Sequence, residues 1–375
     1  MKIAIFTLPL RNYNYGGILQ NYALQTFLIK NFNCEVQTID YKFHSSIKAK
    51  CKSLIKDLIL SRYSNFKKNV NIEFEVFFKQ HLSLSPFFHS YKDVNNYLAE
   101  NKFNVLITGS DQVWRLDYAY GDIKKLMFLD FNSLDKDIKK LAYAASFGVD
   151  TWKYKNETAY VTNALDSFDG IAVRESSGID VCKDNFNLKD IKHLIDPTLL
   201  LHKEDYILNF SLKDIQHKNI YAYVLDNDTE KITALNQIKT KLNLDLNIIE
   251  LASEFLFKVN YKNYKKYDGL KAESLPDWLQ SFYSAKYVIT DSFHGMVFSI
   301  IFNKPFIALG NKKRGMSRFQ SLLKQLDLED RLFYKIDETQ IISKLSEPID
   351  YNKVNNLLNK EKNISLEYFK KFINE

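Results

Sequence analysis

Cysteine is scarce in this sequence, which has only Cys34, Cys51 and Cys182 among 375 residues. Their wide spacing excludes a disulfide framework and a recognisable zinc cluster, and it fits a reducing compartment. No apolar run is long enough for a membrane-spanning helix. The opening residues, MKIAIFTLPL, lack the cleavage site of a signal peptide and are typical of a first strand. We therefore expect a cytoplasmic protein.

A strong excess of one charge is also absent. The net charge of +7 comes from lysines scattered along the chain, as on an ordinary solvated surface. One short stretch, 257–270, alternates tyrosine with lysine. Such interleaving can contact single-stranded nucleic acid or sugar rings. A single short cluster makes no continuous groove, so we interpret it as a surface loop and expect no nucleic-acid partner.

The most informative stretch is 287–310, YVITDSFHGMVFSIIFNKPFIALG. It predicts a strand, a short and almost wholly apolar helix capped by Asp291 or Ser292, and a second buried strand. In parallel sheets, ligands bind beyond the carboxyl ends of strands, where helix N-termini present free amides. His294 lies at such a turn and is a candidate for chemistry. A lone histidine in apolar surroundings can also be purely structural.

Two strands in the first half of the chain also end in polar residues. Strand Ile3–Leu8 is followed by a polar turn through Gly16 and Gly17 and by a helix over 18–29. This is neither a GxGxxG motif nor a phosphate loop, so a tight turn is the preferred alternative to a ligand-binding loop. Strand Phe103–Thr108 ends in GSDQVW, whose side chains could bind a ligand. The alternative is an Asx turn with Trp114 in the core.

Arginines follow two other predicted elements. Arg174 comes directly after strand Gly170–Val173, where it could pair with Glu175 or serve as an anion clamp. Arg318 falls in the first turn of a predicted helix, where a cation opposes the helix dipole. That unfavourable place suggests a bound anion, although a salt bridge to Asp291 would also explain it.

Strands and helices alternate in two series, separated near the Asp196-Pro197 step. We predict an N-terminal Rossmann-like domain over 1–200 with a helical excursion over 45–100, and a C-terminal Rossmann-like domain over 201–350. A last helix over 351–375 should pack back on the first domain. The basic amphipathic part of the excursion, 45–80, either lies on an anionic membrane face or packs on its domain.

A series of motifs in this order resembles the polysaccharide pyruvyl transferase family over nearly the full length: NYGGILQNYALQTFL, TGSDQVW, YAASFG, AVRE, DPTLLL, ITDSFHG, FNKPFIALG and R-x-x-x-R-x-x-x-L-L. The resemblance implies an α/β fold of two Rossmann-like domains with parallel sheets, similar to glycosyltransferases of the B type, with a cleft between the domains. It also implies transfer of pyruvate from phosphoenolpyruvate to saccharide hydroxyls, which forms a ketal in bacterial surface polysaccharide biosynthesis.

The resemblance also implies roles for individual residues. His294 matches the essential histidine, and Asp111 would deprotonate or orient a sugar hydroxyl. The family commonly has an arginine where this chain has Ser292, so Arg314 or Arg318 would have to replace that charge. The expected donor-binding residues are Arg174, Ser292, Gly295, Arg314 and Arg318. The expected acceptor-binding residues are Gly16, Gly17, Gln20, Gln112 and Trp114.

The implied partners are phosphoenolpyruvate, as co-substrate, and a saccharide acceptor carried on a lipid diphosphate. We expect no metal and no further cofactor. Such an acceptor would bring the protein to the inner face of the cytoplasmic membrane as a peripheral protein. Two other functions stay open at this point: a nucleotide-sugar-dependent glycosyltransferase on the same scaffold, and a non-catalytic saccharide-binding protein.

Overall fold

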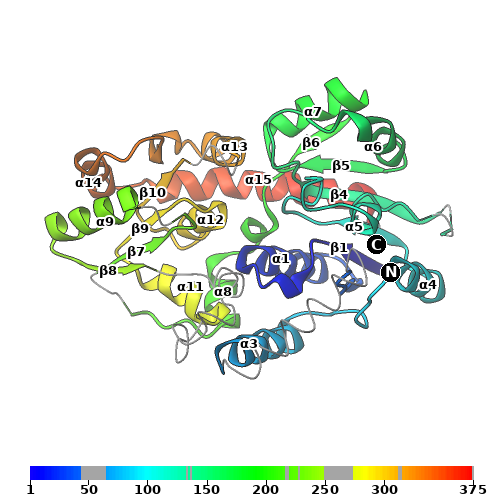
Figure 1. Ribbon diagram of the computed structural model, residues 1–375, viewed down its shortest axis with the longest axis horizontal. Coiled ribbons are helices and arrows are strands. Elements are labelled where there is room, and N and C mark those ends of the chain that lie inside the picture. Colours follow the sequence, from blue (N-terminus) through cyan, green and yellow to red (C-terminus); the bar gives the residue numbers. More distant parts are fainter. Residues whose placement is uncertain are drawn as a thin grey trace. The chain divides into compact units, whose positions relative to one another are not determined.

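The computed structural model describes residues 1–43, 65–131, 134–135, 137–215, 219–226, 229–248, 273–310 and 315–373. Three predicted features lie outside these ranges: residues 45–64 of the helical excursion, the tyrosine- and lysine-rich stretch, and Arg314. The chain divides into two compact units (Figure 1). The first comprises residues 1–59, 75–200 and 360–375, and the second comprises residues 60–74 and 201–359.

The first unit is built on a six-stranded parallel sheet in the order β2-β1-β3-β4-β5-β6. Its strands are β1 (Lys2–Phe6), β2 (Glu35–Thr38), β3 (Val105–Thr108), β4 (Lys139–Ala145), β5 (Gly170–Val173) and β6 (Ile191–His193). From β1 the chain goes to β2 on one side and then to β3 on the other. This reversal makes a topological switch point between β1 and β3, where open α/β sheets bind ligands.

The helices of the first unit are α1 (Tyr15–Asn31), α4 (Tyr91–Asn101), α5 (Asp122–Met127), α6 (Thr158–Leu165) and α7 (Ser176–Phe186). Helix α3 (Asn65–His81) begins in the second unit and ends in the first. Helix α1 begins three residues before the predicted start, because the Asn14 side chain accepts a hydrogen bond from the amide of Gly17 and caps it. The glycine pair therefore lies in the first turn of a helix, and the predicted tight turn is wrong.

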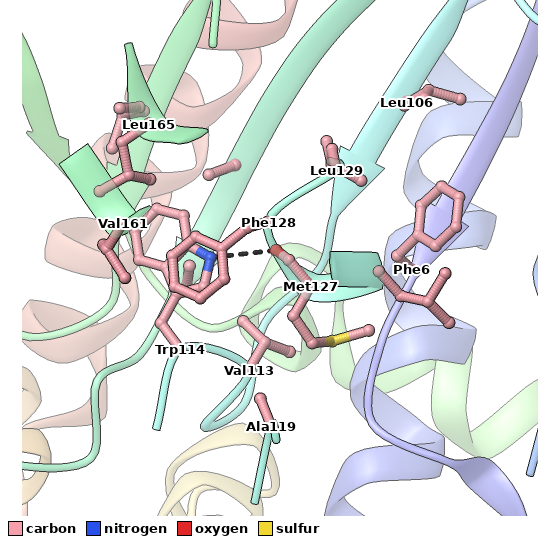
Figure 2. Packing of buried hydrophobic residues seen from close by; sticks show 14 of the residues in the cluster. Phe6, Leu106, Val113, Trp114, Ala119, Met127, Phe128, Leu129, Val161 and Leu165 are labelled. Atoms are coloured by element: carbon pink, nitrogen blue, oxygen red, sulfur yellow. Dashed lines mark hydrogen bonds between the residues drawn. The ribbon is translucent and has the colours of Figure 1, made fainter. Parts of the chain in front are cut away.

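A large apolar cluster fills the space between the sheet and helices α4 to α7. Figure 2 shows Trp114 within this cluster, where its indole Nε1 donates a hydrogen bond of 3.1 Å to the carbonyl oxygen of Met127. The indole ring stacks on Phe128, with ring centroids 5.7 Å apart. These contacts fix Trp114 in the core and thereby hold residues 109–113, which precede it, at the end of β3.

The last helix, α15 (Tyr351–Phe372), enters the first unit at residue 360. There Phe369 packs against Tyr143 of β4 and Phe27 of α1, with centroid separations of 4.7 and 5.9 Å. Tyr368 donates a hydrogen bond to the carbonyl oxygen of Ala142. These contacts fix the C-terminal part of α15 on the sheet of the first unit.

The second unit has a five-stranded parallel sheet in the order β11-β10-β9-β7-β8. Its strands are β7 (Asn219–Tyr223), β8 (Asp245–Ile248), β9 (Tyr287–Thr290), β10 (Phe306–Leu309) and β11 (Leu332–Phe333). Its helices are α8 (Lys203–Asn209), α9 (Thr229–Leu242), α11 (Leu275–Ser284), α12 (Phe293–Ile301), α13 (Ser317–Gln325) and α14 (Glu338–Ser346). Strand β7 lies between β8 and β9, so this sheet has its switch point between β7 and β9.

Two different cores hold the second unit together. An aliphatic cluster joins the sheet to α9 and α14. An aromatic cluster holds α11 and α12, in which Trp278 contacts Tyr223 and Phe298 at centroid distances of 5.2 and 5.1 Å. Helix α12 is buried along its whole length, as its apolar sequence predicts. Among the described residues, no helix combines the length and apolar character needed to cross a membrane.

Candidate functional site

In the second unit, the turn from β9 into α12 carries the candidate histidine. Ser292 is the N-cap of α12, because its Oγ accepts a hydrogen bond of 3.4 Å from the amide of Gly295. The amide of Ser292 itself donates to Oγ1 of Thr290. His294 is the second residue of the helix and is 8% exposed. The local sequence thus places its imidazole in the first turn of a helix, at the switch point of the sheet.

Gly295 allows α12 to lie directly on the strands. A Cβ at this position would clash with Oγ1 of Thr290 and would lie 2.8 Å from a ring carbon of Tyr223. Any side chain would therefore push the helix away from the sheet and move His294 with it. The predicted donor-binding role of the Gly295 amide stays a prediction, because that amide also takes part in the Ser292 cap.

Asp291 precedes the N-cap residue and connects the ends of β9 and β7, the two strands of the switch point. Its carboxylate accepts hydrogen bonds from the amides of Leu225 and Asp226, which follow β7, and from Nζ of Lys231 at 2.7 Å. The alternative salt bridge between Arg318 and Asp291 is therefore wrong. Sequence reasoning missed Lys231. Its position in the first turn of α9, where a cation opposes the helix dipole, is the signal that could have found it.

The start of α13 lies beside the start of α12. The guanidinium carbon of Arg318 is 5.7 Å from the centroid of the Phe293 ring, which in turn is 5.4 Å from the His294 ring. The N-cap of α13 makes no side-chain bond. Ser317 is buried, and its Oγ has no hydrogen-bond partner among the described residues. An uncapped helix start with a hydroxyl and a guanidinium is suited to an oxyanion. Sequence reasoning did not identify Ser317.

In the first unit, Asp111 follows β3 at the switch point. Its backbone φ is +77°, a region that non-glycine residues seldom occupy, although aspartate tolerates it better than most. Asp111 is 6% exposed. Its Oδ1 is 3.5 Å from Nη2 of Arg174, and its Oδ2 faces Gly17 in the first turn of α1. The carboxylate therefore lies against the positive end of a long helix.

Arg174 is enclosed by carboxylates of its own unit. Its side chain is 1% exposed, and Nη1 lies 2.9 Å from Oδ2 of Asp196. Glu175, whose charge also acts on Arg174, accepts hydrogen bonds from Oγ of Ser146 and the amide of Phe147. Burial opposes the charge of Arg174, but the carboxylates of Asp196 and Asp111 outweigh it and raise its pKa. The guanidinium is thus enclosed and bound to carboxylates of its own unit, and its donor-binding role stays a prediction.

The expected acceptor-binding residues divide into two groups. Trp114 and Gln20 are fully buried, which confirms the alternative that Trp114 lies in the core, and their acceptor-binding role stays a prediction. The Gln20 amide donates to Oγ1 of Thr7 and to the carbonyl oxygen of Gly17, which stabilises the start of α1. Gln112 is half-buried and accepts a hydrogen bond from Arg115. For Gln112 and for Gly16 and Gly17, the role stays a prediction.

Comparison with known proteins gives a matching family and solved structures with a similar fold. The family model described as polysaccharide pyruvyl transferase matches residues 14–313, which is most of the chain. No curated protein sequence gives a significant match.

Solved UDP-GlcNAc 2-epimerases are similar in structure. The enzyme from Neisseria meningitidis, bound to UDP-GlcNAc, has a TM-score of 0.55 at 11% identity, covering 99% of this chain and 100% of that one. For the enzyme from Rickettsia bellii the TM-score is 0.53 at 11% identity, with 99% and 98% covered. At such identity the likeness concerns the fold alone. It confirms a fold of two Rossmann-like domains similar to glycosyltransferases of the B type.

Proposed function

Because the chain belongs to the polysaccharide pyruvyl transferase family, we propose that it transfers pyruvate from phosphoenolpyruvate to saccharide hydroxyls in bacterial surface polysaccharide biosynthesis. The products are a pyruvate ketal and phosphate. The observation that carries this proposal is the joint placement of His294 and Arg318 at two adjacent helix starts of the second unit. A donor with a phosphate and a carboxylate requires fixed positive groups and hydrogen-bond donors, together with an acid that works near neutral pH.

In this proposal the donor binds to the second unit. The phosphate would lie against the first turn of α13, where Ser317 and Arg318 supply a hydroxyl and a charge. The Ser292 hydroxyl accepts a hydrogen bond from the helix and can donate its own proton to an oxyanion. Arg318 would then supply the charge that the family's commoner arginine provides at the position of Ser292.

The reaction begins with proton transfer from His294 to the methylene carbon of phosphoenolpyruvate, which makes C2 cation-like. An acceptor hydroxyl attacks C2 and gives its proton to a base, for which we propose Asp111. The C2–O bond to phosphate breaks, and a second hydroxyl adds to C2 and closes the ketal. The proton of the second hydroxyl restores His294, and that on Asp111 leaves with phosphate or to solvent. We propose no cofactor beyond the co-substrate.

The acceptor is expected to be carried on a lipid diphosphate, with the protein bound peripherally at the inner face of the cytoplasmic membrane. The basic segment 45–80 would supply this contact through its lysines. Partitioning onto anionic vesicles tests this part separately. A variant with the lysines of 45–56 changed to glutamate should bind these vesicles much less than the wild type. Equal partitioning would remove the membrane proposal and leave the transfer reaction untouched.

Phosphate release from phosphoenolpyruvate tests the reaction across a panel of lipid-linked or aryl galactosides, mannosides and N-acetylhexosamines. We expect release with at least one acceptor and a loss of about 10²- to 10⁴-fold in His294→Gln, since that variant lacks the acid. The matched control is His202→Gln, in the same unit, where the histidine precedes α8 and plays no part in the proposal.

Other results would favour a different function. Thermal stabilisation by UDP or CMP sugars, without stabilisation by phosphoenolpyruvate, would indicate a nucleotide-sugar-dependent glycosyltransferase. Saccharide binding that is unchanged in His294→Gln, without phosphate release from any acceptor, would indicate a binding protein.

A further inference from the structure

In the first unit, Asp111 is connected to a buried series of polar contacts through Arg174. The inner end of this series is Asp196, whose Oδ1 accepts hydrogen bonds from the amide and hydroxyl of Thr198 at 3.0 and 2.7 Å. Its Oδ2 accepts from Oγ of Ser110 at 3.1 Å and from Nη1 of Arg174 at 2.9 Å. Four donors thus hold one carboxylate, so its position and its charge are both well determined.

Arg174 connects this inner carboxylate to Asp111. It lies directly after β5, and its Nη2 is 3.5 Å from Oδ1 of Asp111. The amide of Ser146, after β4, donates to the carbonyl oxygen of Asp111 and holds the backbone in its unusual conformation. Three neighbouring strand ends of the sheet therefore cooperate to point one carboxylate toward the start of α1. A backbone conformation held in this way is often found at functional sites.

The charges explain why two carboxylates share one arginine. If Asp111 alone faced Arg174, a close one-to-one pair would make its carboxylate a poor proton acceptor. Asp196 lies closer to the guanidinium than Asp111 does and neutralises part of its positive charge. The other titratable groups nearby are Glu175, which bonds to residues after β4, and His193, whose ring contacts the carbonyl oxygen of Arg174. Burial lowers the pKa of His193, so its ring is neutral at pH 7.

We propose that Arg174 and Asp196 are positioning residues for Asp111: they hold its carboxylate at the start of α1, ready to accept a proton from the acceptor hydroxyl. Neither residue touches a substrate. This assignment rests on the proposed function and gives Arg174 a different role from the donor binding predicted from the sequence. The ligand of the first unit would then be a neutral hydroxyl group. The positive end of α1 already faces the Asp111 carboxylate and is therefore not open to an anion.

The test compares steady-state kinetics of Arg174→Met, Arg174→Lys and Asp196→Asn with those of the wild type. We expect Arg174→Met and Asp196→Asn to lower kcat by about 10- to 100-fold, as misplaced catalytic groups do. The KM for phosphoenolpyruvate should change by less than about threefold, since the donor site is intact. Arg174→Lys should recover part of the lost kcat, which a merely structural loss would not predict.

The matched control is Asp40→Asn, in the first unit, where another buried aspartate pairs with an arginine, Arg11, at 2.7 Å. It should keep kcat within about twofold of the wild type if only misplacement of Asp111 matters. Unchanged kcat in Arg174→Met, or an equal loss in Asp40→Asn, would overturn the proposal. If the three variants do not fold, Thr198→Val provides the test, because it removes one bond to Asp196 and should lower kcat by a few fold.

A crystallographic comparison separates this inference from the proposed function. In Arg174→Met the Asp111 carboxylate should move away from the start of α1 by about 1 Å or more, and in Asp40→Asn it should not. If the displacement occurs but no protein form releases phosphate from phosphoenolpyruvate, the positioning stands and the proposed reaction fails. If phosphate is released normally and Asp111 does not move in Arg174→Met, the positioning is wrong.

Discussion

The two units place polar residues at the same topological position but surround it with opposite charges. Among the described residues of the first unit, three buried carboxylates gather around one arginine: Asp111, Asp196 and Glu175 near Arg174. In the second unit, Asp291 is matched by Lys231, and His294 and Arg318 are added. In the proposed function, the same fold serves a neutral hydroxyl at one switch point and an anionic donor at the other, because topology places the site and side chains select the ligand.

The largest expected effect tests the acidic side of this comparison. Asp111→Asn keeps the shape of the side chain and tolerates the positive φ, but it removes the charge that accepts a proton. We expect kcat for phosphate release to fall by about 100-fold or more, with little change in the melting temperature. The control is Asp117→Asn, an exposed aspartate six positions downstream that should be neutral. If Asp111→Asn were fully active, Asp111 would not be the proton acceptor.

The next prediction compares a glycine from each helix start. Gly295→Ala should lower the free energy of unfolding by about 1 to 3 kcal/mol, because the added methyl group meets Thr290 and Tyr223. Gly17→Ala should be neutral or stabilising by up to about 1 kcal/mol, since its Cβ would be 3.6 Å from its nearest neighbours. Denaturant unfolding measures both. Equal destabilisation by the two changes would show that the close approach of α12 to the strands is not special.

A third prediction tests the basic side of the comparison. Arg318→Gln should raise the KM for phosphoenolpyruvate by about tenfold, which is the loss of one charge-assisted contact to an anion. The KM for the acceptor should stay unchanged. Arg115→Gln, in the first unit, is the control, because this arginine pairs with Asp117 and has no part in the proposed donor site. An increase confined to the acceptor KM would reverse the assignment of donor and acceptor to the two units.

The smallest effect concerns a carboxylate that faces another carboxylate. Burial and the nearby charge of Asp277 raise the pKa of Glu273 to about 7. Asp196, by contrast, is a buried carboxylate that pairs with an arginine. The folded state therefore holds the proton on Glu273 more tightly than the unfolded state, and stability falls as pH rises from about 4.5 to about 7. Glu273→Gln should raise the free energy of unfolding at pH 8 by about 1 to 2 kcal/mol and leave it unchanged at pH 4. An equal gain at both pH values would contradict this cause.

Several elements were predictable from the sequence with the bounds that the structure has. Strand β5 was predicted to the residue as Gly170–Val173, and helix α15 starts at residue 351 as predicted, because apolar runs and helical periodicity are local signals. Helix α1 was predicted to start too late, since Asn14 caps a helix that contains two glycines. Local propensity disfavours glycine in a helix, but the cap and the packing of α1 on the sheet outweigh it.

The candidate site was predictable only in part. His294 and Asp111 follow strand ends, and a strand end can be read from the sequence. The partners of Arg174 could not be found in this way, because Asp111 and Asp196 are 63 and 22 positions from it. The resemblance implied that Trp114 binds the acceptor, whereas the structure confirms the alternative in which its indole lies in the core.

By itself, the sequence determined the alternation of strands and helices, the family to which the chain belongs and the turn that carries His294. The tertiary structure alone decided the order of the strands, and with it the two switch points at which polar residues meet. It also decided which charges neutralise one another, as in the Lys231 and Asp291 pair, whose members are 60 positions apart. The physical reason is range: caps and periodicity act within a few residues, whereas ion pairs and burial depend on contacts between distant segments.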